Sequence, residues 1–596
     1  MHRMPYLVPA ASRALPLILT FFLACSASFS TQAYEVSVSA PAALKDLLTE
    51  HLDVVRFSSR TDINADQLNF MIATVSEQVV QLASTEGFFS PVTTVQTDHA
   101  GDTTTIRINV DPGPRTVVSA VDVQVEGAAQ SQSLAQVDAV RQRWSMHSGQ
   151  AFRQEEWAAA KQDGLQMLQE LRYPSARIAD SQARILADAH VAELAVTYDS
   201  GPLFTLGALK VSGTQRYPAS IVYNVNPLSV GEEYSTARLL ELQRQILKTP
   251  YFSNVVIDIA RDTDHATEAP VNVQVTEYPT QRVRGSMGYT TDGGAHVGGL
   301  YSHNNVLGRA WVFDGKLDID ERRQQGSVQL ALPPAPGGTV DSLHGSFERT
   351  AVEGIDLRSQ RLGLRRAHST DTRDTAYSLE YYSDQLEQID GATPPPETFV
   401  QPGTHQALVF GTDRSWRAVD NLVFPRKGHV ISLEGGVAFK GVLSDQTFVR
   451  LHAKLHEYVP MGKRDVIVLR ADGGAVWSTG DNAAIPASLL FRAGGTESIR
   501  GYDFQSIGNE RNGTVYPARY LAAASAEYQH WLSADWGGAA FYDVGTAADT
   551  WQDKSLFHAV GVGVRWRSPV GTVRLDIAYG FQKKQIRPHL SFGVAF

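Results

Sequence analysis

The sequence is almost free of cysteine. Cys25 is the only one among 596 residues. It lies in an N-terminal segment where Arg3 and Arg13 precede an apolar run and small residues continue to Ala33. This order is typical of a secretory signal peptide, so we predict that residues 1–33 are removed by cleavage after Ala33. The remaining chain then has no thiol for a disulfide framework or a cysteine-ligated metal.

The absence of several other sequence features excludes whole classes of function. After the N-terminal segment no run of about 18 apolar residues occurs, which argues against a transmembrane helix. The formal net charge is −10 and no basic stripe is present, so nucleic acid is not an expected partner. The chain lacks a phosphate-binding loop, a Gly-x-Ser-x-Gly elbow and a His-Glu-x-x-His motif, and its 17 histidines are scattered. We therefore expect neither enzyme activity nor a cofactor or metal site.

The first part of the chain contains a threefold repeat. Residues 34–112, 113–200 and 201–279 each show an opening strand, two helices and a pair of strands. Two similar junctions, Asp111-Pro112-Gly113-Pro114 and Asp199-Ser200-Gly201-Pro202, separate the units. Aromatic residues stand before a strand in each unit, at Gly87-Phe88-Phe89, Leu171-Arg172-Tyr173 and Pro250-Tyr251-Phe252. Equal spacing with matching junctions predicts three α+β domains in tandem.

From about residue 281 the pattern changes to strict alternation. Val573, Leu575 and Ile577 share one face of a strand, whereas Arg574 and Asp576 share the other. Apolar residues on one face and charged or small residues on the other suit a transmembrane β-barrel with a water-filled lumen. A soluble β-sandwich also alternates and is the competing interpretation.

Residues 280–596 can be divided into 16 antiparallel strands, an even number as in bacterial barrels. We place them at 281–291, 294–302, 308–319, 323–333, 341–353, 358–368, 373–384, 404–416, 428–438, 445–458, 465–479, 518–531, 536–544, 556–567, 570–580 and 587–596. Both long connections, 385–403 and 480–517, then fall at the same end of the barrel. The predicted fold is therefore three α+β repeats followed by a 16-stranded transmembrane β-barrel.

The longest connection carries the motif Ile499-Arg500-Gly501-Tyr502. Alternation places Glu527 and Asp543, on the two following strands, on the lumen face. We predict that the connection folds into the lumen and that Arg500 forms charge-assisted hydrogen bonds with these carboxylates. Gly501 would permit a tight turn, and Tyr502 would pack against the inner wall. The alternative is that Arg500 is an ordinary solvated loop residue.

Several motifs resemble those of a known superfamily. The three N-terminal units resemble POTRA domains. The loop motif and Phe541-Tyr542-Asp543-Val544-Gly545 resemble the paired signatures of the outer-membrane assembly and two-partner secretion superfamily. The turns at 420–428 and 305–308 are similar to two further signatures of that superfamily. The resemblance implies that Arg500, Gly501 and Tyr502 dock on the inner wall beside Asp543, with Glu527 and Gly545 nearby.

Within the superfamily, three POTRA domains and 16 strands most resemble the outer-membrane subunits of the translocation and assembly module. That resemblance implies an outer-membrane barrel with periplasmic POTRA domains, which contacts outer-membrane lipid and inserts autotransporters and other unfolded β-barrel clients. It also implies a TamB-like partner that spans the periplasm. The alternatives are a general barrel assembly protein, which carries five POTRA domains, a two-partner secretion transporter, which carries two, and a passive porin.

Closure of the barrel requires the first strand, about 282–289, to pair with the last, 587–596. Gly285, Gly288 and Gly593 lack side chains that would strengthen packing across this seam, and Phe596 ends the alternating strand. We predict a weak seam that opens laterally and pairs with a client strand. The alternative is that these glycines only allow the strands to curve.

Overall fold

The computed structural model describes residues 34–60, 62–100, 103–389, 394–441, 443–550, 552, 555–568 and 571–595. The predicted signal peptide, including Cys25, lies outside them. The chain forms two compact units: one comprises the chain up to Gln169 with Ala176–Gly201, and the other comprises Glu170–Ser175 with the chain from Pro202 onward. Among the described residues, no helix is long and apolar enough to cross a membrane.

The first unit contains two α+β domains. In the first domain, the opening strand β1 lies parallel to β3, and β2 lies on the other side of β3. Leu44, Leu48 and Val75 of the helices are buried against Ile106 and Ile108 of the sheet. Its elements are β1 (Glu35–Ser39), α1 (Ala42–His51), α2 (Asp53–Arg56), α3 (Ala65–Thr85), β2 (Val92–Ala100) and β3 (Thr103–Asp111).

The second domain repeats this arrangement, with the sheet order β4–β6–β5. Trp144 packs edge-on against Trp157 and Tyr198 in its core. Its elements are β4 (Val117–Glu126), α4 (Ala129–Gln132), α5 (Leu134–Gln142), α6 (Gln154–Gln169), β5 (Arg177–Leu186), η1 (Ala187–Ala189) and β6 (Val191–Asp199).

The third domain belongs to the second unit and has the sheet order β7–β9–β8. Leu239, Leu242 and Ile246 form the buried stripe of α8, as expected for an amphipathic helix. The predicted sequence of opening strand, helices and paired strands is therefore present three times. The elements of this domain are β7 (Leu206–Ser212), α7 (Ser220–Asn224), α8 (Thr236–Leu247), β8 (Phe252–Ile259), η2 (Thr263–Glu268) and β9 (Ala269–Glu277).

The third domain is hydrogen-bonded to the near end of the barrel. Tyr251 donates its hydroxyl proton to the carbonyl of Ala310 at 2.7 Å, and the Asn304 amide donates to the carbonyl of Pro250 at 2.9 Å. Lys248 forms a salt bridge with Asp371 at 2.6 Å. The aromatic turn before β8 thus does more than pack helix against sheet, because Tyr251 also ties the domain to the barrel.

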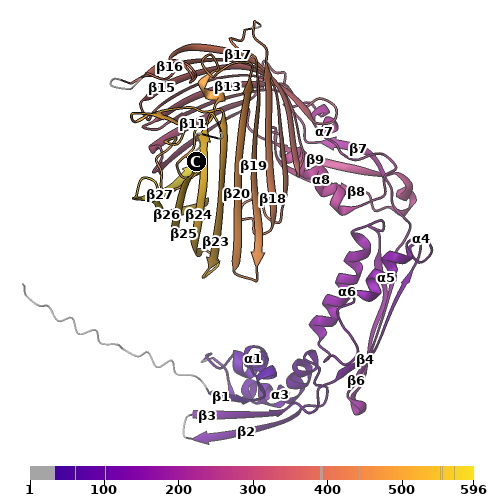
Figure 1. Cartoon of the computed structure of the whole chain (residues 1–596). Helices are drawn as coiled ribbons and strands as arrows, with labels where there is room; N and C mark the ends of the chain where they lie inside the picture. Colours follow the sequence, from indigo (N-terminus) through magenta and orange to yellow (C-terminus); the bar gives the residue numbers. More distant parts are fainter. Residues whose placement is uncertain are drawn as a thin grey trace, which may run out of the picture. The chain divides into compact units, whose positions relative to one another are not determined.

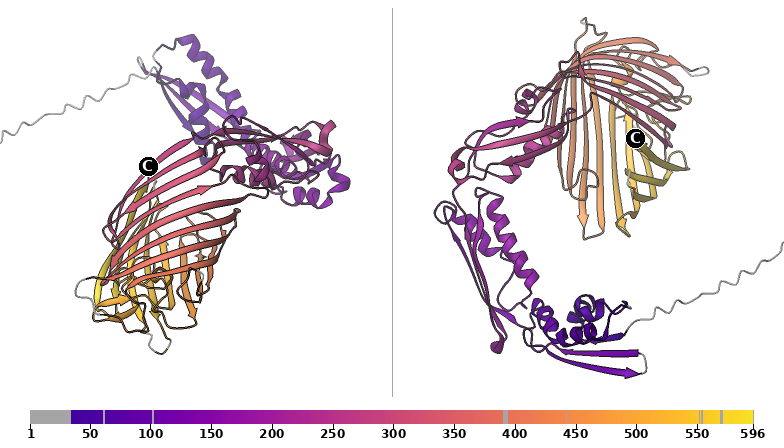
Figure 2. Two further views of the ribbon diagram at one scale, coloured as in Figure 1. Left: turned by 90° about the horizontal axis from the view of Figure 1, so that it is seen from above. Right: turned by 180° about the vertical axis from the view of Figure 1, so that it is seen from behind.

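Sixteen antiparallel strands close into a barrel, which confirms the predicted number and order (Figures 1 and 2). Most bounds differ from the predicted ones by a few residues; the connection predicted at 385–403 is shorter, because β16 and β17 extend into it. The strands are β10 (Gln281–Thr290), β11 (Gly294–Val306), β12 (Trp311–Ile319), β13 (Arg323–Ala331), β14 (Thr339–Val352), β15 (Ile355–Ser369), β16 (Arg373–Gln388), β17 (Gly403–Val419), β18 (Gly428–Ala438), β19 (Phe448–Met461), β20 (Asp465–Ser478), β23 (Tyr520–Trp531), β24 (Trp536–Ala548), β25 (Phe557–Ser568), β26 (Gly571–Gly580) and β27 (Gln585–Ala595).

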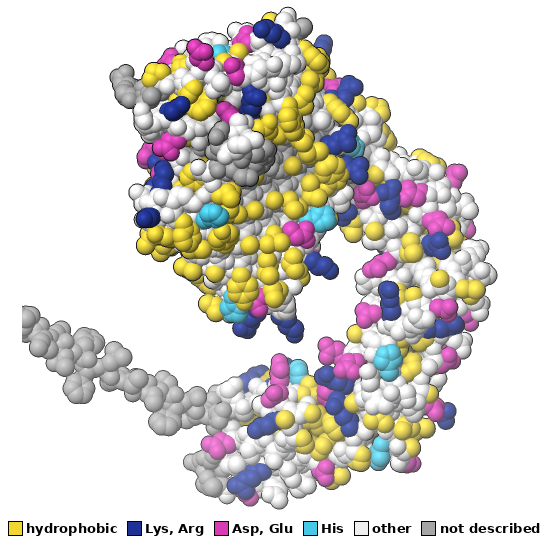
Figure 3. Space-filling view, in the orientation of Figure 1, with side chains coloured by type: hydrophobic (Ala, Val, Ile, Leu, Met, Phe, Trp, Pro, Cys, Tyr) yellow, Lys and Arg dark blue, Asp and Glu magenta, His cyan; other side chains and the backbone are white. Residues whose placement is uncertain are grey.

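The outer surface of the barrel is apolar. Hydrophobic side chains cover the strands in the space-filling view (Figure 3). On β12, Leu317 and Ile319 are exposed outward, while Lys316 and Asp318 form an ion pair on the opposite face. A single closed barrel with this division of faces rules out the β-sandwich interpretation, because a sandwich would bury its apolar faces between two sheets.

Candidate functional site

The longest connection between barrel strands, residues 479–519, folds into the barrel. It contains the short helix η3 (Ala487–Leu489) and a small hairpin of β21 (Asn509–Arg511) and β22 (Thr514–Tyr516), which the sequence pattern did not predict. Several of its apolar side chains belong to one buried cluster with residues of the barrel wall: Ile485, Leu489, Leu490, Phe491, Ile499, Tyr502, Ile507 and Tyr516. The loop is therefore a packed part of the barrel interior.

Arg500 lies at the centre of a buried charge cluster on the inner wall. Its guanidinium binds Asp543 with two donors, Nε to Oδ2 at 2.8 Å and Nη2 to Oδ1 at 2.9 Å. Nη1 donates to Glu527 at 2.7 Å and to Asp576 at 3.1 Å. The backbone amide of Arg500 also donates to Asp543. The predicted residues Arg500, Asp543 and Glu527 are thus brought together, and Asp576 joins them.

Two further arginines balance the carboxylates. Arg565 donates to Glu527 at 2.8 Å and to Asp576 at 2.5 Å, and Arg470 lies 4.0 Å from Asp543. Three guanidinium groups therefore face three carboxylates, so the buried cluster carries no net formal charge. This balance matters because an unpaired charge at a buried position would cost several kcal/mol, on the order of the desolvation penalty of one ion.

The Arg500 side chain is only 3% exposed. Burial alone would lower its pKa, but hydrogen bonds and the charges of Asp543 and Glu527 raise that pKa above its ordinary value. The guanidinium therefore stays charged. Its carbon Cζ also lies 3.3 Å from the ring centroid of Phe541, a cation–π contact. Because each of the three carboxylates is engaged by arginine, the arrangement holds the loop in place and offers no free general base.

Asp576 and Arg565 were not selected as site residues from the sequence. Alternation places Asp576 on the charged face of its strand, and Arg565 alternates with the outward Val562 and Val564. Alternation alone therefore suffices to infer that both side chains face the lumen. Their pairing with Arg500 cannot be inferred in this way, because it depends on how the loop crosses the lumen.

Gly501 and Tyr502 complete the docked motif. Gly501 has φ +88°, a left-handed conformation that favours glycine, and its amide donates to His589 Nε2 at 2.8 Å. The Tyr502 ring is fully buried, and its hydroxyl donates to the carbonyl of His558 at 2.8 Å. We call Arg500, Gly501 and Tyr502 the latch.

The wall beside the latch is lined by glycines. A Cβ on Gly545 would lie 2.7 Å from Ile499 Cδ1, and a Cβ on Gly580 would lie 2.7 Å from the carbonyl oxygen of Gly501. Both separations are too short for real atoms. Gly545, predicted as an inner-wall partner, therefore receives Ile499 rather than Arg500, and Gly580 receives the backbone of the latch.

The loop also contacts the chain on both sides of the seam. The Thr496 amide donates to Asp292, in the turn between β10 and β11, at 2.8 Å. The Thr496 hydroxyl lies 3.2 Å from His589 Nδ1 on β27. Because His589 Nε2 accepts from Gly501, its Nδ1 must carry the proton and donate to Thr496. Thr496 thus links the first hairpin of the barrel to its last strand.

The seam itself is short. Strands β10 and β27 pair from Ser286–Ala595 to Thr290–Ser591, and Gly288 faces Gly593. On its other side β10 pairs with β11 along its whole length, from Gln281 to Thr290. Among the described residues, Gln281–Arg284 have no partner on β27, so the observed pairing starts later than the predicted residue 282. On its other side Gly285 faces Gly299 of β11. Phe596 lies outside the described residues, so the seam role predicted for Gly285 stays a prediction.

Two parts of the chain match known protein families. Residues 305–595 match the Omp85 superfamily domain, and residues 204–278 match the POTRA family, described as a surface antigen variable number repeat. The first match covers most of the barrel, and the second covers the third α+β domain.

Similar proteins include two curated relatives, both named outer membrane protein assembly factor BamA. The protein from Nitratidesulfovibrio vulgaris is 23% identical over 415 residues, which cover 67% of this chain and 52% of the relative. The protein from Neorickettsia risticii is 22% identical over 405 residues, which cover 63% of this chain and 52% of the relative. This chain therefore spans about half the length of the curated relatives it matches.

Among solved structures, BamA from Haemophilus ducreyi lacking POTRA domains 1–3 is similar, with a TM-score of 0.60 and 16% identity. The similarity covers 80% of this chain and 100% of that structure. At this level of identity the comparison supports the fold, a barrel preceded by POTRA-type domains.

Proposed function

This chain carries an Omp85 superfamily barrel domain preceded by a POTRA domain, and from that premise we propose that it assembles proteins in the bacterial outer membrane. The barrel lies in the membrane with its apolar exterior against outer-membrane lipid, and the α+β domains lie in the periplasm. Its clients are unfolded β-barrel proteins.

The observation that carries this proposal is the short seam. A strand whose edge is only partly paired presents free N–H and C=O groups, which template another strand. Gln281–Arg284 of β10 form such an edge among the described residues. Gly288 and Gly593 face each other in the middle of the paired stretch, so that pair contributes no cross-strand side-chain contact. Opening this seam exposes a complete strand to a client and a lateral path into lipid.

The docked loop regulates the seam in this proposal. The latch and Thr496 contact β24, β26 and β27 on one side and Asp292 on the other. Separation of β10 from β27 must break the Thr496–Asp292 bond or carry the loop with one strand. The loop therefore stabilises the closed barrel, and its release accompanies opening.

We further propose a TamA-type role, in which the clients are mainly autotransporters and a TamB-like protein is the periplasm-spanning partner. Three α+β domains ahead of a 16-stranded barrel support this proposal. The second candidate is a general assembly factor, favoured by the names of the curated relatives. A two-partner secretion transporter, which exports one dedicated soluble protein, is the third.

Depletion of the protein followed by quantitative outer-membrane proteomics separates these candidates. A TamA-type role predicts loss of autotransporters with little change in other barrels. Loss of nearly all barrels would favour the general assembly factor. Unchanged barrels together with one missing secreted protein would overturn the assembly proposal altogether.

A further inference from the structure

The turn between β17 and β18, residues 420–427, reaches strands that are not its neighbours. In the barrel order, β19, β20, β23 and β24 lie between β18 and β25. The ring centroid of Phe424 nevertheless lies 5.3 Å from Cζ of Arg567 on β25. Arg426 Nη2 donates to the carbonyl of Gly462, in the turn between β19 and β20, at 3.3 Å. We call residues 420–427 the strap.

The residues that receive the strap face the lumen. On β25, Val562 and Val564 are exposed on the outer face, so alternation places Arg567 on the inner face. On β23, Tyr528 is exposed on the outer face, and Trp531, three residues later, is on the inner face and only 8% exposed. A turn that touches the inner face of a distant strand must lie across the opening of the barrel.

This opening is at the end of the barrel that adjoins the third α+β domain. In a series of antiparallel strands, every second connection lies at the same end. The β11–β12 connection carries Ala310, which accepts the hydrogen bond from Tyr251 of that domain. The β17–β18, β19–β20 and β23–β24 connections lie at the same end by this alternation. In the orientation proposed above, the strap therefore crosses the periplasmic mouth of the lumen.

Arg567 joins the strap to β23 as well as to β25. Its Cζ lies 3.5 Å from the ring centroid of Trp531, so the guanidinium is stacked on the indole. Its Nη1 donates to the carbonyl of Ala534, in the turn after β23, at 3.1 Å. A planar guanidinium stacks on aromatic rings in a way that an ammonium group does not. Phe424 thus rests on an arginine that is itself held in place.

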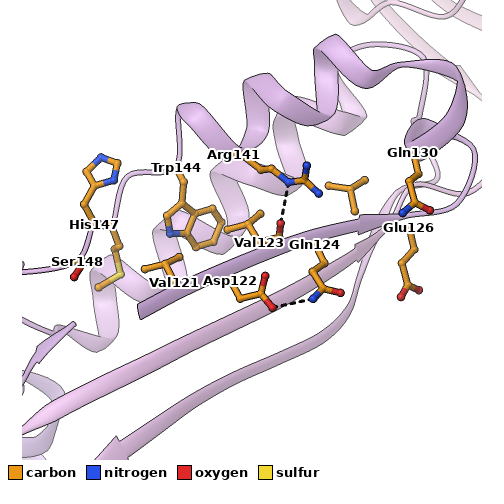
Figure 4. A pocket seen from close by; sticks show the side chains of 12 residues that line it. Val121, Asp122, Val123, Gln124, Glu126, Gln130, Arg141, Trp144, His147 and Ser148 are labelled. Carbon is orange, nitrogen blue, oxygen red and sulfur yellow. Dashed lines mark hydrogen bonds between the residues drawn. The ribbon is translucent and has the colours of Figure 1, made fainter. Parts of the chain in front are cut away.

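Proximity of an arginine to a tryptophan does not by itself produce such a stack. In the second α+β domain, Arg141 and Trp144 line the same cavity, of about 880 Å³ (Figure 4). There, Arg141 Nε donates to the backbone carbonyl of Val123 at 3.1 Å. The contacts of Arg567 with two aromatic rings are therefore a specific feature of the strap.

The strap is held in shape by its own side chains. Asp420 Oδ1 accepts hydrogen bonds from the backbone amides of residues 426 and 427, at 2.9 and 3.1 Å. Asn421 Oδ1 accepts from the amides of residues 423 and 424, at 2.8 and 2.9 Å. These four bonds lie within the turn, so they persist if the strap moves as one piece.

Gly428 follows the strap and fixes its end. Its φ is +106°, and a Cβ there would lie 1.8 Å from the carbonyl oxygen of Ala418, so a side chain does not fit. Together with Asp420, Asn421 and Phe424, Gly428 belongs to the turn signature at 420–428. The signature residues therefore shape the strap and direct Phe424 to Arg567.

The contact of the strap with the barrel wall leaves buried donors unsatisfied. Nε of Arg426, Nε of Arg567 and Nε1 of Trp531 have no hydrogen-bond partner in the described part of the chain. A buried donor without an acceptor is unfavourable, and water would satisfy it once the strap lifts. The latch, in contrast, is held by ion pairs with carboxylates. The strap is therefore the more easily released of the two.

We propose that the strap is a lid over the periplasmic mouth of the lumen. The mouth is closed while Phe424 rests on Arg567, and it opens when the strap swings away as one piece about its two ends. The internal bonds from Asp420 and Asn421 move with it. This inference goes beyond the proposed function, and its tests measure access to the lumen without any client.

The first test is thiol labelling in a phospholipid nanodisc. Cys25, in the predicted signal peptide, is the only cysteine, so an introduced thiol is a unique reporter. Ala539 of β24 is buried and is the next lumen-facing residue after Gly537, which faces Trp531. Ala539→Cys should react slowly with a polyethylene-glycol maleimide. Adding Phe424→Ala should make the reaction roughly tenfold faster, as expected for loss of a cation–π contact.

Two further variants control this measurement. Val423→Ala alters an exposed apolar residue of the same turn and should leave the labelling rate unchanged. Arg567→Lys keeps the charge but removes the planar group, and it should accelerate labelling as Phe424→Ala does. Equal rates in Phe424→Ala and Val423→Ala would overturn the proposal. If Phe424→Ala does not fold, an unchanged rate in Arg567→Lys would overturn it in the same way.

The second test uses hydrogen exchange to distinguish a swinging lid from an unfolding turn. In Arg567→Lys, the amides of residues 423, 424, 426 and 427 should keep their protection while labelling at position 539 becomes faster. Asn421→Ala, the positive control, should lose protection at residues 423 and 424. Loss of protection at all four amides in Arg567→Lys would contradict a strap that moves as one piece.

Discussion

Arg500 holds the docked loop through several contacts that reinforce one another. Its fork geometry matches Asp543, and its remaining donors reach Glu527 and Asp576. Such a pair gains little over apolar packing in net stability, but it is specific, because removing one partner leaves buried charge uncompensated. The cluster therefore determines where the loop sits more than how stable the barrel is.

Arg500→Ala should release the loop. It leaves three carboxylates facing Arg565 and Arg470 alone, and breaking such a buried pair costs about 3–5 kcal/mol. We expect the loop at 479–519 to become sensitive to proteinase K while the barrel stays resistant. Arg511→Ala, which alters an exposed arginine of the same loop, serves as the control. Equal protease resistance in both variants would show that Arg500 does not hold the loop.

At the residue scale, the sequence can predict which side chains face the lumen, because alternation has a period of two residues. That reasoning sufficed for Glu527 and Asp543 and would have sufficed for Asp576. It could not predict the contacts of Thr496 with Asp292 and His589, since these depend on the irregular path of the loop.

The loop acts as one element that contacts both sides of the seam. Thr496 joins Asp292 to His589, and Arg587 of β27 forms a salt bridge with Asp503 of the loop at 2.6 Å. The backbone pairing between β10 and β27 is short, and the contacts of the loop inside the lumen reinforce it.

Asp292→Ala should make the seam open more readily. The variant removes a charged acceptor from the Thr496 amide, and hydrogen bonds to charged groups contribute about 1.5–3 kcal/mol. A free-energy loss of that size corresponds to a roughly tenfold or larger change in an equilibrium. A cysteine at Gly288 should therefore react with a maleimide roughly tenfold faster or more. Asp535→Ala, in a turn at the other end of the barrel, should leave the rate unchanged. No difference between the two would argue against a link across the seam.

Among the elements, the barrel strands were well predicted because each keeps its alternation over many residues. The hairpin of β21 and β22 was missed, since each strand has three residues and so short a run carries no readable period. The pairing of β10 with β27 was overestimated for a different reason. Alternation fixes which face a residue occupies but leaves the register along the seam open.

At the scale of the whole molecule, the barrel turns apolar side chains outward and charged side chains inward. This arrangement is the reverse of a soluble domain and is stable only in lipid. The α+β domains, in contrast, bury their apolar residues between helices and sheet. The chain therefore combines parts suited to two different solvents.

Leu317→Arg tests the outer surface. A charged side chain on the lipid face destabilises a barrel by an amount that rises with depth to about 2–4 kcal/mol at the midplane, so folding into phospholipid bilayers should become less favourable. Gln325→Arg places the same charge on the neighbouring strand, facing the lumen opposite Asp318, and should cost far less. Similar losses in the two variants would contradict the assigned faces.

In the proposed function, the seam between β10 and β27 must open for clients to be inserted. A disulfide between Gly288→Cys and Gly593→Cys would lock it, because facing Cα atoms in an antiparallel pair are about 4.5–5.5 Å apart, within the range that a disulfide spans. The matched control, Gly285→Cys with Gly299→Cys, joins β10 to β11.

The decisive measurement is client insertion by the two double-cysteine proteins under oxidising and reducing conditions. We predict that the seam-locked protein fails to insert autotransporters until reductant is added, and that the control protein inserts them in both conditions. Full insertion by the oxidised, seam-locked protein would contradict the account.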